Sequence, residues 1–364
     1  MKLDQLFIQD YRNIIQADLS LSPKLNCFVG DNGMGKTNLL DAVYYLSFCR
    51  SSINHQDSQI VRHGTACFQI QGTYTQPDGT PLSVGCVAGN GSRKQFRRDR
   101  KEYQRYSDHI GLIPLVMISP GDTILIQGGS EERRKFMDMV ISQYDTSYLK
   151  NLIDYGKALA QRNALLKQET PADPELFLMW EQMMDASGME VYRKRREFID
   201  RLVPLFNKVY SGIGDASETV SLEYTSHAER GSLLEQLSRD RYKEMVVGYS
   251  LHGIHKDELE MNLSGFPIRR EGSQGQNKSY LTALKLAQYI LLADICSKKP
   301  LLLLDDIFDK LDARRVGRIL DLVSDDTRFG QVFITDVSRH HLDGILDEIG
   351  CEYSLFTVES GSVR

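Results

Sequence analysis

The sequence predicts an α/β fold in which a parallel sheet carries a phosphate-binding loop and is joined by an antiparallel β extension and an inserted, mainly helical lobe. Three observations predict this fold. A Gly-rich loop lies between a β-like segment and an amphipathic helix near the N-terminus. Strands and helices alternate in the last third of the chain, as in parallel sheets covered by helices. Apolar residues recur at helical spacing through most of residues 130–247.

The N-terminal part begins with two short β segments, residues 3–14 and 25–30, followed by the loop and a helix from about Lys36 to Phe48. From about Thr65 to Ile118, short alternating segments are punctuated by turns such as "QPDGT". This pattern predicts the antiparallel extension.

Residues 130–247 carry two long helical patterns that are interrupted near "ETPADPE". The C-terminal part alternates between a helix over "NKSYLTALKLAQYILLADICS", a buried strand "PLLLLDD", a helix after Asp312 and a strand "GQVFITD". We therefore expect residues 1–129 and 248–364 to form one split nucleotide-binding domain, with residues 130–247 inserted as a helical lobe.

The composition is that of a globular protein. The 364 residues are 41% apolar and 26% charged, which suffices for a substantial core in one large or two ordinary domains. Six scattered Cys residues form no C-x-x-C pair, so neither a disulfide framework nor a metal knuckle is predicted. The N-terminus does not resemble a signal peptide, and no apolar run approaches the ~20 residues that span a bilayer. We expect a cytoplasmic protein without membrane contact.

The segment "GDNGMGKT", Gly30 to Thr37, satisfies the phosphate-loop pattern G-x-x-x-x-G-K-[ST]. Its glycines let backbone N–H groups approach phosphate oxygens, and the following helix directs its positive end at them. Lys36 would bridge the β and γ phosphates, and the Thr37 hydroxyl would bind Mg²⁺. A Gly-rich turn without nucleotide is the alternative. The predicted ATP ligands in this segment are Gly30, Asp31, Asn32, Gly33, Met34, Gly35, Lys36, Thr37 and Asn38.

A pair of acidic residues follows a buried strand. "LLLLDD", Leu301 to Asp306, ends in two carboxylates at the edge where a phosphate crevice forms. Asp305 is predicted to hold Mg²⁺ and Asp306 to act on the attacking water, which favours hydrolysis over passive binding. Helix-capping or loop acids are the alternative interpretation.

The segment "SQGQ", Ser273 to Gln276, stands where a helix begins. Such a helix end has unpaired N–H donors that suit a phosphate. A polar loop with a helix cap explains the segment equally well when it is taken alone.

Together these elements resemble the ABC-type ATPase superfamily. In this chain "SQGQ" occupies the signature position, "LLLLDD" the Walker B position and "DKLD", Asp309 to Asp312, the D-loop. The chain is more closely similar to the RecF family of bacterial DNA repair. That similarity runs over nearly the whole chain and includes "DYRNI", "SPGDTILIQGGSEERRKFMD", "GIHKDEL" and "LFTVESGSV".

The resemblance implies that Ser273, Gly275 and Gln276 of one subunit contact the γ-phosphate in the P-loop of another, so that ATP joins a homodimer. It places Arg12 near the nucleotide. ADP lacks the γ-phosphate, so hydrolysis should open the dimer. The implied enzyme is a weak ATPase used as a conformational switch, with Lys36, Asp305, Asp306 and, in trans, Ser273 as its catalytic residues.

The chain departs from the ABC-type pattern at three places. One is the Q-loop, where "ISPGD" stands and no glutamine is assigned. Asp306 stands where Glu is typical, and the shorter acid predicts slow turnover. The usual switch His is missing after "QVFIT", where Thr335 and Asp336 stand. His255 and Asp257 match a family motif, "GIHKDE", for which an ion-pair or turn role is the alternative to a functional contact.

The segment "SRKQFRRDRKEYQR", Ser92 to Arg105, contains seven basic and two acidic residues with two interleaved aromatics, a pattern that suits a phosphate backbone. A solvated hairpin would look similar. The DNA candidates are Arg93, Lys94, Arg97, Arg98, Arg100, Lys101 and Arg105. "YRKRR", Tyr192 to Arg196, is a weaker candidate, and we interpret "EERRK", Glu131 to Lys135, as an intramolecular ion-pair site.

No base-reading module is apparent, so DNA binding should be sensitive to salt and not sequence-specific. The resemblance implies recognition of gapped or single/double-strand junction DNA. It also implies that the protein works with RecO and RecR to load RecA onto single strands covered by single-strand binding protein.

Three other functions fit the sequence less well. An ABC transporter nucleotide-binding subunit would normally carry the switch His and a Leu-Ser-Gly-Gly-Gln signature. An SMC-type chromosome ATPase needs a long coiled coil, for which residues 130–247 are too short. A P-loop kinase has no use for a signature helix or a D-loop.

Overall fold

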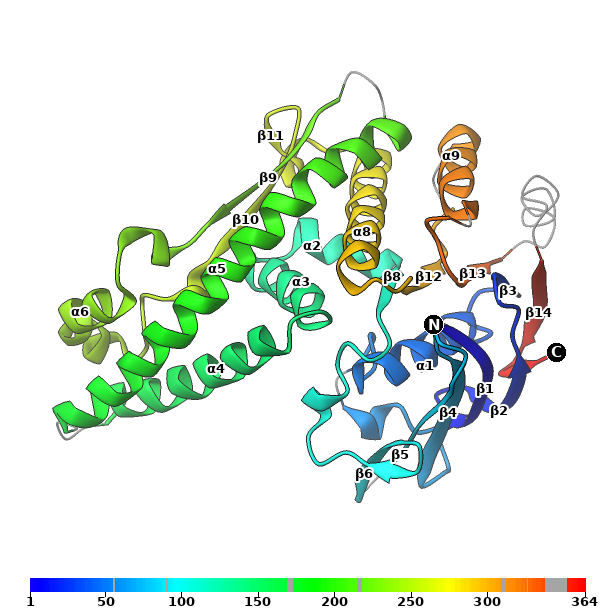
Figure 1. Cartoon of the computed structure of the whole chain (residues 1–364), viewed down its shortest axis with the longest axis horizontal. Helices are drawn as coiled ribbons and strands as arrows, with labels where there is room; N and C mark the ends of the chain where they lie inside the picture. Colours follow the sequence, from blue (N-terminus) through cyan, green and yellow to red (C-terminus); the bar gives the residue numbers. More distant parts are fainter. Residues whose placement is uncertain are drawn as a thin grey trace. The chain divides into compact units, whose positions relative to one another are not determined.

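The computed structural model describes the chain except for residues 55, 90, 169–172, 215–217, 309–311, 326 and 338–351. The chain forms two compact units (Figure 1). Unit 1 comprises Met1–Asp122, Val209–Asp215 and Gln274–Arg364, and unit 2 comprises Thr123–Lys208 and Ala216–Ser273.

A parallel sheet forms the centre of unit 1. Its strands are, in spatial order, β14 (Tyr353–Glu359), β3 (Leu25–Val29), β13 (Val332–Asp336), β12 (Leu301–Asp305) and β8 (Leu115–Ile118), with the short β15 (Ser362–Val363) antiparallel at the edge. Every residue of β3, β8, β12 and β13 is buried, as expected for a sheet covered on both faces. The antiparallel extension was predicted to continue to Ile118, but β8 pairs parallel with β12.

An antiparallel sheet forms the other layer of unit 1. Its strand order is β2 (Ile14–Ser20), β1 (Lys2–Tyr11), β4 (Cys67–Thr75), β5 (Pro81–Gly89), β6 (Ser92–Arg98) and β7 (Lys101–Glu102). Alternate residues of β4 and β5 are buried, so one face packs on the core and the other faces solvent. In β1 a register shift between Leu3 and Gln5 interrupts the alternation.

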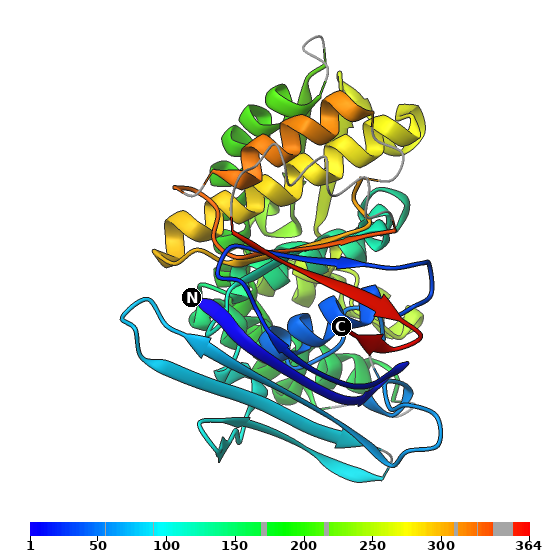
Figure 2. The same cartoon turned by 90° about the vertical axis from the view of Figure 1, so that its right-hand side faces the viewer.

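Helix α1 (Lys36–Phe48) lies between the two sheets of unit 1 (Figure 2). It contacts β1, β4 and β5 of one sheet and β8, β12 and β13 of the other. The sequence predicted an amphipathic helix with these bounds, and the bounds are correct. The helix is instead buried nearly all round, because both of its sides face a sheet.

Two further long helices belong to unit 1, α8 (Gln274–Cys296) and α9 (Ala313–Ser324). Unit 2 contains α2 (Ile124–Gln127), α3 (Ser130–Ser142), α4 (Thr146–Leu166), most of α5 (Pro174–Ile213), α6 (Leu233–Val247) and α7 (Ile268–Glu271). Short 3-10 turns are η1 (Asp57–Gln59), η2 (Tyr106–Asp108), η3 (Pro120–Thr123), η4 (His227–Arg230) and η5 (Ile254–Lys256).

Unit 2 also contains a three-stranded antiparallel sheet, which the sequence analysis did not predict. Its order is β11 (Phe266–Pro267), β10 (Glu258–Leu263) and β9 (Val220–Thr225). Because β10 pairs with β9 over six residues, residues 248–273 group with this unit. The sequence analysis placed them with the nucleotide-binding half.

Buried ion pairs hold unit 2 together and explain the "GIHKDE" segment. The Asp257 carboxylate accepts hydrogen bonds from Arg195, Tyr224 and Ser226 at 2.5–2.6 Å. His255 bonds the Tyr155 hydroxyl at 2.7 Å through Nδ1 and the Ser250 carbonyl at 3.1 Å through Nε2. These contacts are all within unit 2, so both residues have the structural role that was left open.

Two basic segments of unit 2 form ion pairs within that unit. In "YRKRR", Arg193, Lys194, Arg195 and Arg196 each pair with at least one carboxylate. In "EERRK", Arg133 pairs with Glu258 at 2.8 Å and Lys135 with Glu131 and Glu132 at 3.0 Å. The interpretation of the second segment as an ion-pair site is confirmed.

Among the described residues, no helix combines the length and apolar character needed to cross a membrane.

His109 ties the segment after β7 to α1 and should make unit 1 sensitive to acid. Its Nε2–H donates to the Leu46 carbonyl at 2.7 Å, and its Nδ1 accepts from the Tyr103 hydroxyl at 3.1 Å. Burial lowers the pKa of His109 from about 6.5 to about 4. The unfolded chain therefore takes up this proton first, and stability present above pH 6.5 is lost as the pH falls towards 4.

We predict that His109→Gln weakens this loss, because Gln does not titrate. For a fully buried ring, this pKa shift corresponds to at most about 3 kcal/mol of the free energy of unfolding. Melting temperatures of both proteins between pH 7 and pH 4.5 test this. Parallel pH curves for the two proteins would show that His109 does not contribute.

Candidate functional site

The loop between β3 and α1 has a backbone that requires glycine. Gly33 and Gly35 have φ angles of 83° and 115°, in the left-handed region. A Cβ on Gly30 would lie 2.2 Å from the Val358 carbonyl oxygen, and one on Gly35 would lie 2.6 Å from Asn13 Oδ1. The loop thus lets backbone N–H groups line a concave turn that ends at the start of a 13-residue helix.

Lys36 is buried at the start of α1, with 4% of its surface exposed. Its Nζ donates to the carbonyl oxygens of Gly30 at 2.6 Å and Asp31 at 3.0 Å. The ammonium is therefore held within the loop formed by its own backbone. A phosphate in this loop would meet a positive charge that is already in place.

Asp305, at the end of β12, is the centre of the polar site. Its Oδ1 accepts hydrogen bonds from the Thr37 hydroxyl at 3.0 Å and the Thr335 hydroxyl at 2.8 Å. The same Thr335 oxygen accepts the backbone N–H of Asp306 at 3.0 Å. One hydroxyl thus bonds the carboxylate of Asp305 and the backbone of Asp306, although the sequence left the role of Thr335 open. Asp306 itself has a φ of 46°, and its carbonyl accepts from Lys278 at 3.3 Å.

Burial raises the pKa of Asp305, and the hydrogen bonds from Thr335 and Thr37 partly offset that rise. A divalent cation beside the carboxylate would favour its charged form. The Thr37 hydroxyl and the Asp305 carboxylate are oxygen ligands of the kind that Mg²⁺ prefers, and Mg²⁺ takes its other ligands from water and phosphate. They fit a nucleotide-bound magnesium. Within the described residues, no cluster of three His, Cys, Asp or Glu forms a separate metal site.

Asn13 supports the loop from behind and was missed by the sequence analysis. Its Nδ2 donates to the carbonyl oxygens of Gly33 at 3.3 Å and Met34 at 3.0 Å, while its Oδ1 accepts from Asn38 Nδ2 at 2.7 Å. Carbonyl oxygens only accept, so the amide nitrogen of Asn13 must face them. In a trans peptide, the C=O of Met34 and the N–H of Gly35 point opposite ways, so this bond aims the Gly35 N–H away from Asn13.

The C-terminal hairpin supports the same peptide. The Gly361 N–H donates to the Met34 carbonyl at 3.1 Å, and the Ser360 N–H contacts Met34 Sδ at 3.2 Å. Ser360 and Gly361 both have positive φ angles, in the tight turn between β14 and β15. The "SG" pair in the closing segment signals such a turn, but no local pattern says what the turn contacts.

Arg12 lies in a neighbouring network. Its Nε is 3.7 Å from Asp41 Oδ2, and its side chain is 22% exposed. Asp41 is fully buried in α1 and also accepts hydrogen bonds from Tyr11, Ser51 and Ser52. The structure thus gives Arg12 a carboxylate partner on the helix that follows the phosphate loop.

The signature segment stands at the start of α8. Ser273 precedes the helix and is exposed, and Gly275 and Gln276 lie in its first turn, half-buried. The Gly275 carbonyl accepts from the Ser279 hydroxyl at 2.9 Å. Of the predicted D-loop, residues 309–311 lie outside the described residues, and Asp312 caps α9 by accepting the Arg315 N–H at 2.9 Å.

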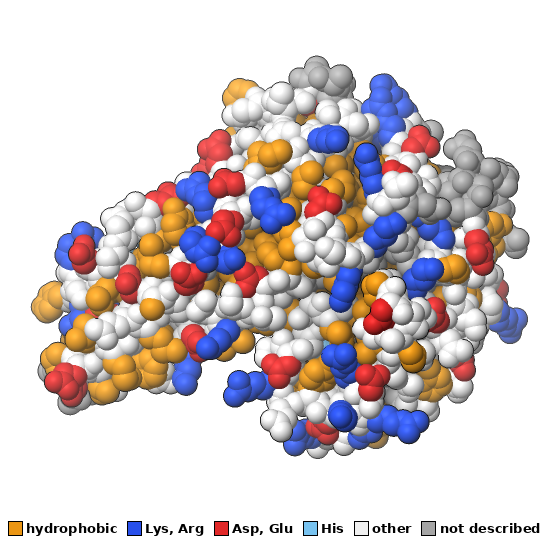
Figure 3. Space-filling model, in the orientation of Figure 1, with side chains coloured by type: hydrophobic (Ala, Val, Ile, Leu, Met, Phe, Trp, Pro, Cys, Tyr) orange, Lys and Arg blue, Asp and Glu red, His pale blue; other side chains and the backbone are white. Residues whose placement is uncertain are grey.

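The basic segment forms β6, β7 and the turn between them, and in Figure 3 Lys and Arg side chains gather over this region at the lower edge. Lys94 has to be removed from the DNA candidates. Its ammonium points inward, bonding the Cys49 carbonyl, pairing with Asp57 at 3.2 Å and lying 4.5 Å from the centre of the Tyr45 ring. The other six candidates are exposed: Arg93, Arg97, Arg98, Arg100, Lys101 and Arg105.

A family model and curated sequences match this chain over nearly its whole length. The family model described as RecF/RecN/SMC N terminal domain matches residues 2–354. The chain is 58% identical to the DNA replication and repair protein RecF of Bacteroides fragilis, covering 100% of this chain and 98% of that protein. It is 57% identical to the protein of the same name from Bacteroides thetaiotaomicron, with the same coverage.

Solved structures give the same picture. The recombination mediator protein RecF-ATP in the RecFOR pathway superposes with a TM-score of 0.89 at 25% identity, covering 100% of this chain and 97% of that one. The Smc head domain of Pyrococcus furiosus has a TM-score of 0.60 at 14% identity, covering 100% and 95%. The second likeness shows the fold alone.

We predict that Asn13→Asp weakens nucleoside triphosphate binding about tenfold or more, because a carboxylate would face two carbonyl oxygens. Asn13→Ala should lose less, about threefold, since it removes bonds without adding repulsion. Titration with a fluorescent triphosphate analogue measures both. Exposed Gln16→Ala on β2 is the control, and wild-type affinity in Asn13→Asp would contradict the supporting role.

Proposed function

The chain belongs to the RecF family of DNA replication and repair proteins, and from this premise we propose that it is an ATP-dependent DNA-binding repair protein driven by a slow ATPase switch. The observation that carries the proposal is the contact of Asp305 with Thr37 and Thr335. It joins the phosphate loop to the acidic strand end in one polar site, as a nucleotide with its metal requires.

ATP is the proposed cofactor, with Mg²⁺. The loop residues from Gly30 to Asn38 would cradle the phosphates, with Lys36 on the β and γ phosphates. Thr37 and Asp305 would hold the metal, which neutralises charge that develops on the phosphate oxygens. This supply of backbone N–H groups and one buried ammonium suits a polyphosphate.

Asp306 is the proposed residue for the attacking water. Its backbone N–H bonds the Thr335 hydroxyl, which keeps the residue next to Asp305 at the end of β12. It is one methylene shorter than the Glu typical of ABC-type ATPases, and a base must come within hydrogen-bond reach of the proton that it removes. Slow turnover suits a timing switch rather than a motor.

Dimerisation is the proposed consequence of ATP binding. Ser273 is exposed just before the 23-residue helix α8, and the positive N-terminal end of a helix suits a phosphate. In the proposed dimer, Ser273, Gly275 and Gln276 of each copy complete the γ-phosphate site of the other. Arg12 is proposed to sense the nucleotide through α1. Because ADP has no γ-phosphate, hydrolysis would release the second copy.

The proposed DNA target is gapped duplex or a single/double-strand junction, bound without sequence preference. The exposed arginines of β6 and its turn support a phosphate contact. RecR and RecO are the proposed protein partners. The proposed outcome is the loading of RecA onto strands covered by single-strand binding protein. The proposed location is the cytoplasm. The solved relative named for the RecFOR pathway supports the partners.

We predict that Lys36→Ala abolishes ATP binding, whereas Ser273→Arg keeps ATP binding but loses ATP-driven dimers. The first variant removes the loop's buried charge, and the second puts a bulky cation where the other copy's site must close. Sedimentation velocity with ATP, ADP and no nucleotide measures both.

The matched control is Ser211→Arg, which adds the same charge at an exposed position of α5. It should dimerise like the wild type. A Ser273→Arg protein that dimerises with ATP as the wild type does would refute the trans contact.

We predict that Thr335→Val lowers ATP turnover about tenfold, since Asp305 and the Asp306 N–H both lose a partner. Thr335→Ser should retain most activity because it keeps the hydroxyl. Phosphate release and triphosphate binding are measured together, since the prediction concerns turnover more than affinity. Equal turnover in the Val and Ser variants would show that the hydroxyl is dispensable.

A further inference from the structure

The solvent-facing side of the antiparallel sheet in unit 1 carries an unusual number of glutamines. Strand register brings them into rows. The first row crosses five strands: Gln16, Gln9, Gln69, Val87 and Gln95. The second row lies beside it: Asp18, Phe7, Gln71, Gly85 and Arg97. Strands favour β-branched and aromatic residues, so a face of long amides needs a reason other than strand stability.

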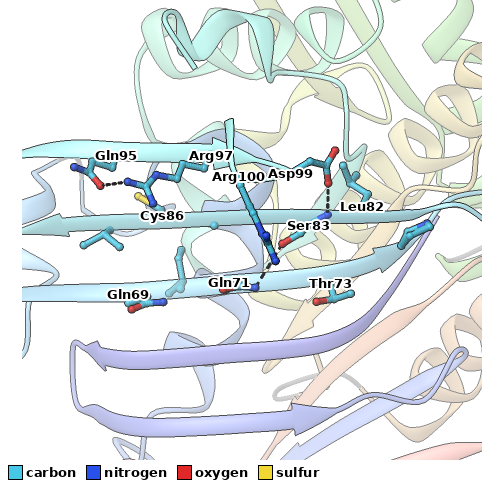
Figure 4. A pocket seen from close by; sticks show the side chains of 14 residues that line it. Gln69, Gln71, Thr73, Leu82, Ser83, Cys86, Gln95, Arg97, Asp99 and Arg100 are labelled. Carbon is cyan, nitrogen blue, oxygen red and sulfur yellow. Dashed lines mark hydrogen bonds between the residues drawn. The ribbon is translucent and has the colours of Figure 1, made fainter. Parts of the chain in front are cut away.

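A groove of about 630 Å³ runs over this face on β4, β5 and β6 (Figure 4). Gly85 lies between Gln71 and Arg97 in the second row, and its missing side chain leaves the floor open there. Gln69, Gln71 and Gln95 line the groove together with Arg97 and Arg100. The lining thus includes amides and guanidinium groups, together with Asp99, and Arg100 reaches across the groove towards Gln71.

The basic side of the groove is ordered and accessible. Arg97 donates to Gln95 Oε1 at 2.6 Å, a bond that holds its guanidinium beside the amide row. Arg93, with 83% of its side chain exposed, follows the same face of β6. Six exposed basic residues of this segment stand against Asp99 and Glu102, so the β6–β7 edge is positive and complements a phosphate backbone.

Amides beside a basic edge have a specific chemistry. A glutamine amide offers two donors and an acceptor on a flexible chain, so it can bond polar groups on the edge of any base without a sequence preference. A duplex hides those edges in its grooves, and its phosphates would reach only the arginines. A single strand can lay its bases over the sheet while its phosphates follow the basic edge. Phe7, half-buried in the second row, offers a surface for stacking.

We propose that this glutamine face is a binding platform for single-stranded DNA, with phosphates along Arg97 and Arg100 and bases over Gln69 and Gln71. The inference rests on the proposed DNA-binding function and adds to it the strand type and the surface that takes it. It also gives the junction preference a physical basis, since one surface of the protein would hold only the unpaired strand.

The test measures binding of a labelled single-stranded 20-mer and of a duplex of equal length to the full chain at several salt concentrations. The double variant Gln69→Ala with Gln71→Ala should bind the single strand about tenfold more weakly, with an unchanged salt slope, and should bind the duplex as the wild type does. Arg97→Gln should weaken single-strand binding and reduce the salt slope by about 0.7. The matched control, Gln161→Ala with Gln168→Ala, removes two exposed amides from unit 2 and should change nothing.

Wild-type single-strand affinity in the Gln69/Gln71 variant would overturn the platform, even where Arg97→Gln binds poorly. An equal loss of duplex and single-strand binding would also overturn it, because the amides would then not read unpaired bases. Absence of DNA binding by the wild-type protein would instead refute the proposed function itself. Melting temperatures of the variants identify any loss that comes from unfolding.

Discussion

The site depends on the hydrogen bonds that Asp305 accepts from Thr37 and Thr335. Asp305 is buried at the end of β12, Thr335 stands on the adjacent strand β13, and Thr37 follows the loop that leaves β3. β3, β13 and β12 are consecutive neighbours in a parallel sheet, so their carboxyl ends meet at one edge. Burying a carboxylate without such partners would cost desolvation free energy. The two hydroxyls offset that cost and fix the position of the carboxylate.

The phosphate loop is equally dependent on residues far from it in the chain. Asn13 lies before β2, and Gly361 belongs to the last hairpin, yet both bond the Met34 carbonyl. Close approach of Val358 to Gly30 and of Asn13 to Gly35 explains why neither glycine tolerates a side chain. The two ends of the sequence therefore complete the unit that holds the nucleotide loop, which is why unit 1 must be assembled from separated segments.

The antiparallel sheet serves two purposes in the same unit. Its inner face packs against α1 and keeps that helix buried on the side that the parallel sheet does not cover. Its outer face is mostly polar on β4, where Gln69, Gln71 and Thr73 lie, whereas Phe7 of β1 and Val87 of β5 interrupt it. Lys94 shows how strand alternation decides which side chains reach solvent. It belongs to the inner face and pairs with Asp57, whereas Arg93 and Arg97 on either side of it face solvent.

The sequence by itself determined the α/β fold class, the phosphate loop, the bounds of α1 and the acidic strand end, because each is written in a local pattern of a few residues. It also carried the family resemblance, which the full-length relatives confirm. Only the tertiary structure decided the roles of Thr335 and Asn13 and the inward direction of Lys94. It also decided the parallel pairing of β8 and the sheet of unit 2. Alternation shows that a strand exists, but its partner and the face it buries depend on residues tens to hundreds of positions away.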